Sequence, residues 1–332
     1  MNIFDRIYLR AKKDPKKIVL PEGQEPRIME AASFTVKEGL ARIVLLGKSD
    51  IILEKARNNN IDISNIELVD PQKDEGLEDY IQSYWQLRKD KGVTVEEAEE
   101  LLLKDPVYYG AMMLRKARVD GFVAGASHTT SDVARAILRC ISRDPEHQVA
   151  SGSFLIELKD KQYGENGLFL LADCGIVPLP SPEQLADIAI TSVKFWNKIT
   201  GYQPRVAMLS FSTKGSSSAP PVSKVRKAYE IAKKIKPDLI IDGELQLDSA
   251  IVPAVAKIKV PDSPLAGRAN ILIFPDLDAG NIAYKLIQRL AQARVVGPLI
   301  QGLSRPCSDL SRGATPKEII DAIAVTVVMA QQ

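Results

Sequence analysis

The stretch that decides the fold is Asn270-Ile-Leu-Ile-Phe-Pro-Asp-Leu-Asp-Ala-Gly-Asn-Ile282. It begins as a short apolar strand, passes through the turn residues Pro275 and Asp276, and continues into a helical pattern. Turns from strand to helix are where α/β proteins build their ligand sites. This stretch therefore predicts an α/β protein whose binding residues lie at the ends of strands.

The same alternation of strand and helix patterns recurs along the rest of the chain. Short apolar runs predict strands at residues 18–20, 43–46, 121–124, 168–172, 206–209, 239–241 and 271–274. Such alternation is typical of βαβ units around largely parallel sheets. At 332 residues the chain exceeds what one hydrophobic core usually supports, so we expect two α/β domains.

Two breaks in the pattern suggest where the domains meet. One is the charged, proline-containing stretch Arg143-Asp-Pro-Glu-His147, and the other lies near residues 299–306. They predict a discontinuous first domain, residues 1–146 plus 302–332, and a second domain, residues 147–301. A segment at about residues 74–116 is dense in Glu, Lys and Arg at helical spacing, and it predicts a helical insertion in the first domain.

Charge and cysteine content exclude several classes of protein. The 44 basic and 42 acidic residues give a net charge of +2, which offers no electrostatic footprint for nucleic acid or an anionic membrane. The three cysteines are widely spaced and form no Cys-x-x-Cys pair, which argues against a disulfide framework or a zinc site. The most apolar segment near the end, residues 322–330, is too short to span a bilayer. We therefore expect a cytoplasmic protein with small-molecule partners.

Several familiar catalytic motifs are absent from the sequence. No Gly-x-Gly-x-x-Gly follows a strand, and there is neither a Gly-x-x-x-x-Gly-Lys-Ser/Thr loop nor a His-Glu-x-x-His. His128 and His147 are the only histidines, and neither stands in a promising position for a Ser-His-Asp triad. The candidates for chemistry are instead polar clusters at predicted strand ends.

The first cluster follows the strand at residues 121–124. It is Ser127-His-Thr-Thr-Ser-Asp132, with Arg135 one turn further along the predicted helix. A helix N-terminus with hydroxyls such as those of Ser127 and Thr130 nearby binds anions readily. The alternative is that Thr129 and Asp132 only cap the helix, and both interpretations stay open.

Two further clusters fall in the predicted second domain. The loop at residues 210–218 contains Ser212 and Lys214 and could contact a phosphoryl or adenosine group, although loops of this composition are often flexible surface segments. Asp242-Gly-Glu-Leu-Gln246 places two carboxylates and an amide after the strand predicted at residues 239–241. Capping of the following helix explains part of that pattern.

The last cluster is Ser311-Arg312-Gly313, just before the final helix. It offers a hydroxyl donor, a fixed positive charge and a small residue that lets a ligand approach, a combination that suits phosphate. A solvated polar connection is the alternative. From spacing alone, Glu318 fits a capping box that begins at Thr315, and Arg88 fits a solvated helix face.

Taken in order, five motifs resemble the phosphate acetyl/butyryl transferase family, and the acetyltransferase branch in particular. They are Pro21-Glu-Gly23, Asp242-Gly-Glu-Leu-Gln246, Phe274-Pro-Asp-Leu-Asp-Ala-Gly-Asn-Ile282, Gly297-Pro298 and Asp309-Leu-Ser-Arg-Gly313. The resemblance covers nearly the whole chain. It implies two α/β domains with an interdomain cleft, similar to isocitrate and isopropylmalate dehydrogenases, in a homodimer. It also implies reversible acetyl transfer between coenzyme A and inorganic phosphate, with no metal or redox cofactor.

The resemblance assigns roles to individual residues. Ser311 and Arg312 match the active-site hydroxyl and the arginine that binds phosphate, and Arg88 and Arg135 match basic substrate-binding positions. The family's catalytic base is usually Asp, and Glu318 stands at that position here. We expect further contacts with coenzyme A or phosphate from Ser127, Thr130, Ser212, Lys214 and Gly313.

Two alternatives to acetyl transfer remain open. Propionyl or butyryl transfer differs by a methylene or two, which changes pocket fit by only ~1–3 kcal/mol each. A non-catalytic domain that senses acyl-CoA is a different class. Retention of Ser311 and Arg312 disfavours the sensor.

Overall fold

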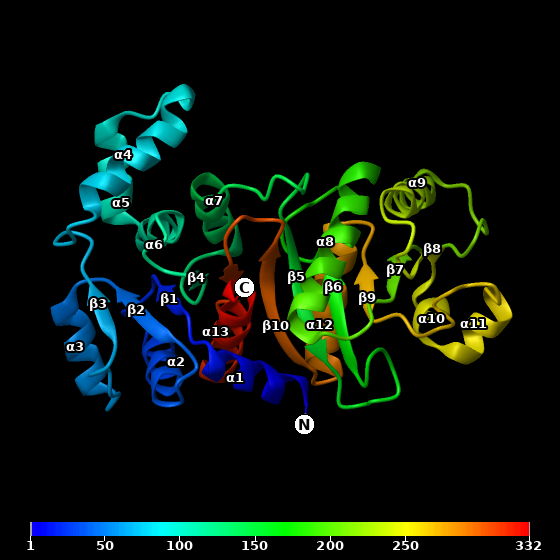
Figure 1. Ribbon diagram of the computed structural model, residues 1–332, viewed down its shortest axis with the longest axis horizontal. Helices are drawn as coiled ribbons and strands as arrows, with labels where there is room; N and C mark the ends of the chain where they lie inside the picture. Colours follow the sequence, from blue (N-terminus) through cyan, green and yellow to red (C-terminus); the bar gives the residue numbers. More distant parts are fainter. Residues whose placement is uncertain (1, 332) are drawn as a thin grey trace. The chain divides into compact units, whose positions relative to one another are not determined.

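The computed structural model describes residues 2–331 and has a mixed α/β fold (Figure 1). It divides into two compact units. The first contains the chain up to Ser142 together with the chain from Leu303 onward, and the second contains Arg143–Gly302. The breaks expected from the sequence lie at residues 146/147 and 301/302.

The first unit is built on a parallel sheet. Its strands lie in the order β3 (Glu67–Val69), β2 (Arg42–Leu46), β1 (Lys17–Leu20), β4 (Gly121–Ala124) and β11 (Cys307–Asp309). Each strand is an apolar run with both faces covered, as the near-continuous burial of β1, β2 and β4 shows. The first three predicted strands are therefore confirmed.

Helices cover the first sheet on both faces. Outside residues 77–104, the helices of this unit are α1 (Ile3–Lys13), α2 (Pro26–Lys37), α3 (Ser49–Asn58), α6 (Pro106–Arg115), α7 (Thr130–Cys140) and α13 (Pro316–Ala330). In Figure 1, α2 and α13 lie below the strands and α6 and α7 above them. Residues 319–328 of α13 are all buried because the helix packs against β1, β4, α1 and α2.

The charged segment from residue 74 is helical, as its spacing predicts. It forms α4 (Leu77–Arg88), a 3₁₀ turn at Lys89–Lys91 and α5 (Val95–Lys104), and α4 packs against α5. Its last helix, α6, packs on β1 and β4. That helix therefore belongs to the layer that covers the sheet.

The second unit has a mixed sheet. Its strands lie in the order β10 (Arg294–Gln301), β5 (Ser151–Glu157), β6 (Leu168–Ala172), β9 (Ile271–Ile273), β7 (Val206–Leu209) and β8 (Ile241–Leu245). The four neighbouring strands β6, β9, β7 and β8 run parallel to one another. Strand β5 runs antiparallel to both β6 and β10. Its helices are α8 (Pro182–Thr200), α9 (Pro220–Ile235), α10 (Leu247–Ile251), α11 (Pro253–Lys259) and α12 (Leu277–Leu290).

One strand of this sheet differs from the prediction. The sequence predicts a strand at residues 239–241 with Asp242 and Glu244 after it, but β8 begins at Ile241 and contains both carboxylates. Both residues are 1% exposed. A search for apolar runs does not find this part of the strand, because the strand contains two carboxylates. Partners elsewhere in the unit allow these charged residues to be buried.

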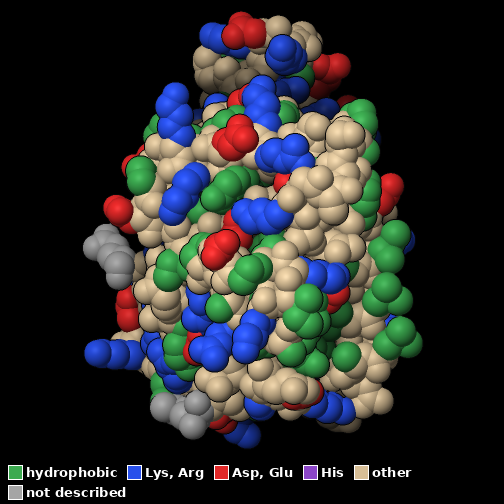
Figure 2. Space-filling view, turned by 90° about the vertical axis from the view of Figure 1, so that its right-hand side faces the viewer, with side chains coloured by type: hydrophobic (Ala, Val, Ile, Leu, Met, Phe, Trp, Pro, Cys, Tyr) green, Lys and Arg blue, Asp and Glu red, His purple; other side chains and the backbone are tan. Residues whose placement is uncertain are grey.

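One face of the second unit carries α9, α10 and α11 (Figure 1). Lysine and arginine side chains are spread over this face with acidic and hydrophobic side chains between them (Figure 2). The basic residues of α9 and α11 are Lys224, Arg226, Lys227, Lys233, Lys234, Lys257 and Lys259. Within the described chain, no helix is both long and apolar enough to cross a membrane.

Candidate functional site

Three turns lie along one edge of the sheet in the first unit. They follow β1, β4 and β11, which are neighbours and run parallel, so their carboxyl ends meet at the same edge. The turns are Pro21–Gly23, Gly125–Thr129 and Leu310–Ala314. Two of them contain predicted site residues.

Glu22 organises the turn after β4. Its carboxylate accepts hydrogen bonds from the backbone N–H groups of Gly125, Ala126, Ser127 and His128, at 2.7–3.0 Å. The Ser127 hydroxyl and His128 Nδ1 also contact it, at 2.9 and 2.8 Å. Burial opposes ionisation of this carboxyl, but the hydrogen bonds from His128, Ser127 and Ala126 outweigh burial and lower the Glu22 pKa to about 2.

The predicted anion site at the start of α7 is thus partly filled by the protein itself. Four backbone N–H groups that could bind an external anion are bound to Glu22 instead. The Thr129 side chain caps α7 by accepting from Asp132 N–H at 3.2 Å, which is the capping alternative. Arg135 is exposed and pairs with Asp132 at 2.9 Å. Thr130, the first residue of α7, is exposed.

Arg27 joins this turn to the loop after β11. Its guanidinium donates to the backbone carbonyls of Arg312 and Ala314, both at 2.9 Å, and to that of Ala126 at 3.0 Å. Arg27 is placed by the first turn of α2, where Glu25 is the N-cap and Pro26 the first helical residue. One planar guanidinium therefore fixes two loops that are far apart in the sequence.

The loop after β11 presents its polar groups to solvent. Ser311, Arg312 and Gly313 are all exposed, and the Ser311 hydroxyl accepts from Gly313 N–H at 3.3 Å. Arg27 binds the Arg312 backbone, whereas the Arg312 side chain forms no ion pair with any residue from 2 to 331. A hydroxyl and a guanidinium on a fixed backbone can together bind a phosphoryl group.

Glu318 caps α13, as its spacing predicts. Its Oε2 accepts from Thr315 N–H at 2.8 Å and from the Thr315 hydroxyl at 3.0 Å, and Glu318 N–H donates to that hydroxyl at 3.3 Å. This is a complete capping box with Pro316 at the first helical position. The carboxylate is half-buried and stands seven residues after Ser311.

Asp309 is a residue that sequence reasoning missed. It ends β11, is 1% exposed, and neither carboxylate oxygen makes a hydrogen bond within residues 2–331. Burial raises the Asp309 pKa to about 7; the nearby Thr130 hydroxyl and Leu310 N–H oppose this effect, and the charge of Glu22 adds to it. Its place as the first residue of the motif Asp309-Leu-Ser-Arg-Gly313 could have identified it as a candidate site residue.

Arg88 lies at the C-terminal end of α4. Its Nε is buried and has no hydrogen-bond partner among the described residues. Burial raises the pKa of Cys140 to about 12, and Arg88 is near enough to that thiol to oppose the shift. Cys140 ends α7 and Thr130 begins it, so the two residues are about 15 Å apart along the helix. Arg88 is therefore near the end of α7 that is opposite to Thr130.

The predicted loop site of the second unit is closed by its own residues. The Ser212 hydroxyl donates to Glu244 Oε1 at 3.2 Å, and Gly215 N–H donates to the same oxygen at 2.7 Å. Lys214 Nζ pairs with Asp242 and also donates to the Gly243 carbonyl at 3.2 Å. Burial opposes ionisation of Glu244, but Arg226 and Gly215 N–H outweigh burial and lower its pKa to about 2. These bonds tie the loop to β8.

Comparisons with known proteins decide the family. The family model described as phosphate acetyl/butaryl transferase matches residues 2–327. The chain belongs to the phosphate acetyl/butyryl transferase family. It is 50% identical to the phosphate acetyltransferase of Thermoanaerobacterium thermosaccharolyticum over 331 residues, covering 100% of both chains. Membership makes it an acyltransferase, as its motifs predict.

Solved structures agree with the predicted fold. A phosphotransacetylase from Streptococcus pyogenes is 37% identical, covers 99% of this chain and 98% of its own, and has a TM-score of 0.91. A 4-hydroxythreonine-4-phosphate dehydrogenase from Klebsiella pneumoniae, at 11% identity, covers 96% of this chain and 98% of its own, with a TM-score of 0.56. This second likeness shows the fold alone, and it supports the expected dehydrogenase-like architecture of the family.

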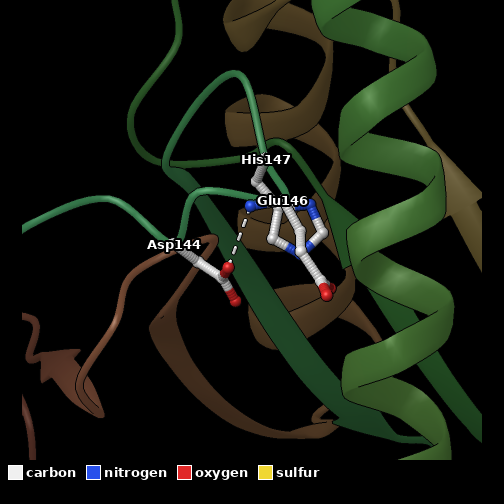
Figure 3. Close-up of side chains that lie close together, drawn as sticks. All are labelled: Asp144, Glu146 and His147. Carbon is white, nitrogen blue, oxygen red and sulfur yellow. Dashed lines mark hydrogen bonds between the residues drawn. The ribbon is translucent and has the colours of Figure 1, made fainter.

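One group of side chains in this acyltransferase has the composition of a metal site. Asp144, Glu146 and His147 each bring a ligand atom within 4.8 Å of the others (Figure 3). Lys194 pairs with Asp144 at 3.4 Å and with Glu146 at 3.1 Å, so a cation already faces both carboxylates. His147 Nδ1 contacts Asp187 at 3.2 Å and the Thr191 hydroxyl at 2.8 Å. These contacts give each of the three side chains a partner within the protein, which accounts for their arrangement without a metal ion.

Proposed function

We propose that this chain transfers an acetyl group reversibly between coenzyme A and inorganic phosphate, so that acetyl-CoA and phosphate give coenzyme A and acetyl phosphate. Similarity over the full length to a protein named phosphate acetyltransferase supports this reaction. The structural observation that carries it is the Arg312 side chain, which is exposed and unpaired among the described residues on a loop whose backbone Arg27 fixes.

In the direction that consumes acetyl phosphate, the thiol of coenzyme A attacks the acetyl carbonyl. A thiol with a pKa of ~8.5 is only a few per cent thiolate at neutral pH, so a base is needed. Glu318 takes the thiol proton, Arg312 holds the phosphoryl oxygens, and Ser311 donates a hydrogen bond to charge that develops at the reacting centre. Both substrates are bound together, so no covalent acyl-enzyme forms.

The remaining substrate contacts fall into two kinds. Thr130, Arg135 and Gly313 are exposed, and they contact coenzyme A or phosphate directly. The polar groups of Ser127, Ser212 and Lys214 bind protein carboxylates, so these residues contribute mainly by holding their turns in place. Arg88 contributes long-range positive charge from the end of α4.

The proposed reaction uses no metal or redox cofactor, and coenzyme A enters it as a substrate. The proposed compartment is the cytoplasm, because Cys140, Cys174 and Cys307 are all buried free thiols, which suits a reducing environment. Neither nucleic acid nor membrane is a proposed partner.

A homodimer is the proposed assembly, and α12 is its proposed contact. Ile282, Leu286 and Leu290 lie four residues apart and are 59%, 52% and 80% exposed. They form an apolar row on one face of the helix, which a second copy would cover. Light scattering after size exclusion should give twice the chain mass for the wild type and the chain mass for Leu286→Glu. A monomeric wild type would exclude the dimer.

Release of free coenzyme A thiol from acetyl-CoA, measured with and without inorganic phosphate, tests the function. Phosphate-dependent release that propionyl-CoA and butyryl-CoA support less well would establish acetyl transfer. Faster release from a longer acyl-CoA would move the specificity to that substrate. Binding of acetyl-CoA without any phosphate-dependent release would contradict the enzyme and favour a sensor.

A further inference from the structure

Asp309 combines two properties that rarely occur together without a function. The carboxyl group is almost completely buried, and neither oxygen has a hydrogen-bond partner in the described chain. A buried polar group without a partner is costly, and in native structures such a group usually has a specific explanation. The other buried carboxyl of this edge, Glu22, accepts several hydrogen bonds.

The position of Asp309 connects it to the proposed site. It ends β11 and stands two residues before Ser311 and three before Arg312. Its Oδ1 lies against Gly125, where a Cβ would overlap this oxygen, so only glycine fits there. The Thr130 hydroxyl lies near enough to affect its ionisation, and Thr130 is exposed at the start of α7. Thr130 is therefore an exposed residue close to the buried carboxyl.

Burial and the charge of Glu22 favour the neutral form of Asp309. The surrounding elements carry Glu22 and His128 from two turns, Asp132 and Arg135 on α7, Glu25 and Arg27 at the start of α2, Lys317, Glu318 and Asp321 on α13, which packs against β11, and Arg312 on the loop after β11. The charge of Glu22 raises the Asp309 pKa. Arg27 binds backbone carbonyls and Glu25, and Arg135 pairs with Asp132. With a pKa of about 7, the carboxyl is about half protonated at neutral pH.

The proposed reaction has a use for such a proton. When the thiol attacks acetyl phosphate, a C–S bond forms and the bond from carbon to the phosphate oxygen breaks. The electron pair goes to that oxygen, and phosphate would leave the dianionic substrate as a trianion unless a proton reaches it. Glu318 is the proposed base, so a second carboxyl group that can give up a proton near neutral pH would divide the base and acid roles between two residues.

We propose that Asp309 supplies this proton through the Thr130 hydroxyl. In the substrate complex the Thr130 hydroxyl accepts from protonated Asp309, a hydrogen bond that the free protein does not make, and donates its own proton to the departing phosphate oxygen. In the reverse direction, phosphate attacks the thioester, and its proton returns to Asp309 along the same path. Asp309 is a positioning residue in this scheme, and Thr130 is the group that touches the substrate. The inference rests on the proposed acetyl transfer and adds an acid to it.

The pH dependence of kcat/KM for acetyl phosphate tests the proposal. This direction avoids inorganic phosphate as a substrate, which itself titrates near neutral pH. For the wild type, kcat/KM should fall as pH rises through about 7, because Asp309 must be protonated. Asp309→Asn and Thr130→Val should each lose about 10²-fold in turnover and lose this alkaline limb. Thr130→Ser, which keeps the hydroxyl, should retain both.

Asp321→Asn is the matched control. Asp321 is another buried carboxylate of this unit, bonded by Tyr8 at 2.5 Å, and its loss should affect stability and leave the alkaline limb in place. An Asp309→Asn enzyme that keeps wild-type turnover, or that loses turnover but retains the limb, would overturn the inference. A Thr130→Val enzyme with the wild-type profile would do the same.

Two further measurements separate this inference from the proposed function. A wild type without phosphate-dependent thiol release contradicts the function itself, whereas an active wild type with an unaffected Asp309→Asn variant contradicts only the inference. Carbon-13 NMR of the substrate-free protein needs no turnover. The resonance that Asp309→Asn removes should titrate near pH 7. Titration near pH 4, as for an ordinary aspartate, would contradict the proposal.

Discussion

Two polar loops of similar composition have opposite surroundings. The loop at residues 210–218 of the second unit and the loop at Leu310–Ala314 of the first each follow a strand and contain serine, glycine and one cation. Lys214 of the second-unit loop pairs with buried Asp242. Arg312 of the first-unit loop is exposed, and Arg27 binds its backbone and leaves its side chain available.

The difference shows where to look for chemistry in such a protein. In the second-unit loop the polar side chains are partners for buried carboxylates, so their hydrogen-bonding capacity is used to stabilise the fold. In the first-unit loop the backbone is fixed and the side chains are open, which is the arrangement that binding and catalysis need. We therefore expect substitutions to affect turnover in the first loop and stability in the second.

The largest effect is expected for Glu318→Gln. A base role predicts a turnover loss of about 10² to 10⁴-fold, whereas glutamine preserves the capping box and should change stability little. Thr315→Ala is the matched control, since it removes the cap, costs about 1 kcal/mol and leaves the carboxylate in place. Steady-state kinetics and thermal melting of both variants separate the roles. Wild-type turnover in Glu318→Gln would leave Glu318 only as a cap.

Arg312→Lys should reduce kcat/KM for acetyl phosphate by about 10² to 10³-fold. A lysine keeps the charge but cannot replace the planar guanidinium, which binds two phosphoryl oxygens at once. Arg305→Lys, at an exposed arginine shortly before β11, is the control and should behave like the wild type. Saturation of Arg312→Lys by phosphate at the wild-type concentration would remove Arg312 from the phosphate site.

Ser311→Ala should lower turnover by roughly 10²-fold with little change in KM, the pattern of a lost transition-state donor. Ser216→Ala is the counterpart in the second-unit loop, where the hydroxyl contacts Ser212 Oγ at 3.0 Å and accepts from Thr213 N–H at 3.1 Å. That variant should keep turnover within a few-fold. Equal losses of turnover in Ser311→Ala and Ser216→Ala would contradict the assignment of catalysis to the first-unit loop and stability to the second-unit loop.

The sequence predicted the local features and missed the long-range ones. The capping box at Thr315 follows from a short spacing, and the structure confirms it. Glu22 and Arg27 act on residues 99 to 287 positions away, and no local pattern contains those distances. The buried state of Asp309 depends in the same way on Gly125, and strand β8 has charged residues because their partners lie elsewhere in the unit.

Glu22→Gln should destabilise the first unit by about 2–3 kcal/mol at pH 7, because an amide has one oxygen to accept what two carboxylate oxygens accept now. The folded-state pKa of Glu22 is about 2, below its usual 4.5, so its contribution is complete above about pH 4.5 and declines as pH falls towards 2. Urea unfolding at pH 7 and pH 3 should show a smaller difference at pH 3. Glu99→Gln, at an exposed position of α5, should show none at either pH.

The smallest effect is expected for Lys214→Ala. It leaves the Asp242 carboxylate buried without its ion pair, which should cost the second unit about 1–2 kcal/mol, and Asp242→Asn in the same chain should restore part of that loss. Turnover should change only a few-fold, because the ammonium group is already bound to the protein. A drop in kcat/KM of more than about tenfold, with unfolding unchanged, would show that Lys214 exchanges Asp242 for the substrate. The second-unit loop would then bind its ligand by releasing Asp242. In that case, polar groups that are paired within the free protein could still be functional, and pairing would no longer distinguish structural from functional polar groups.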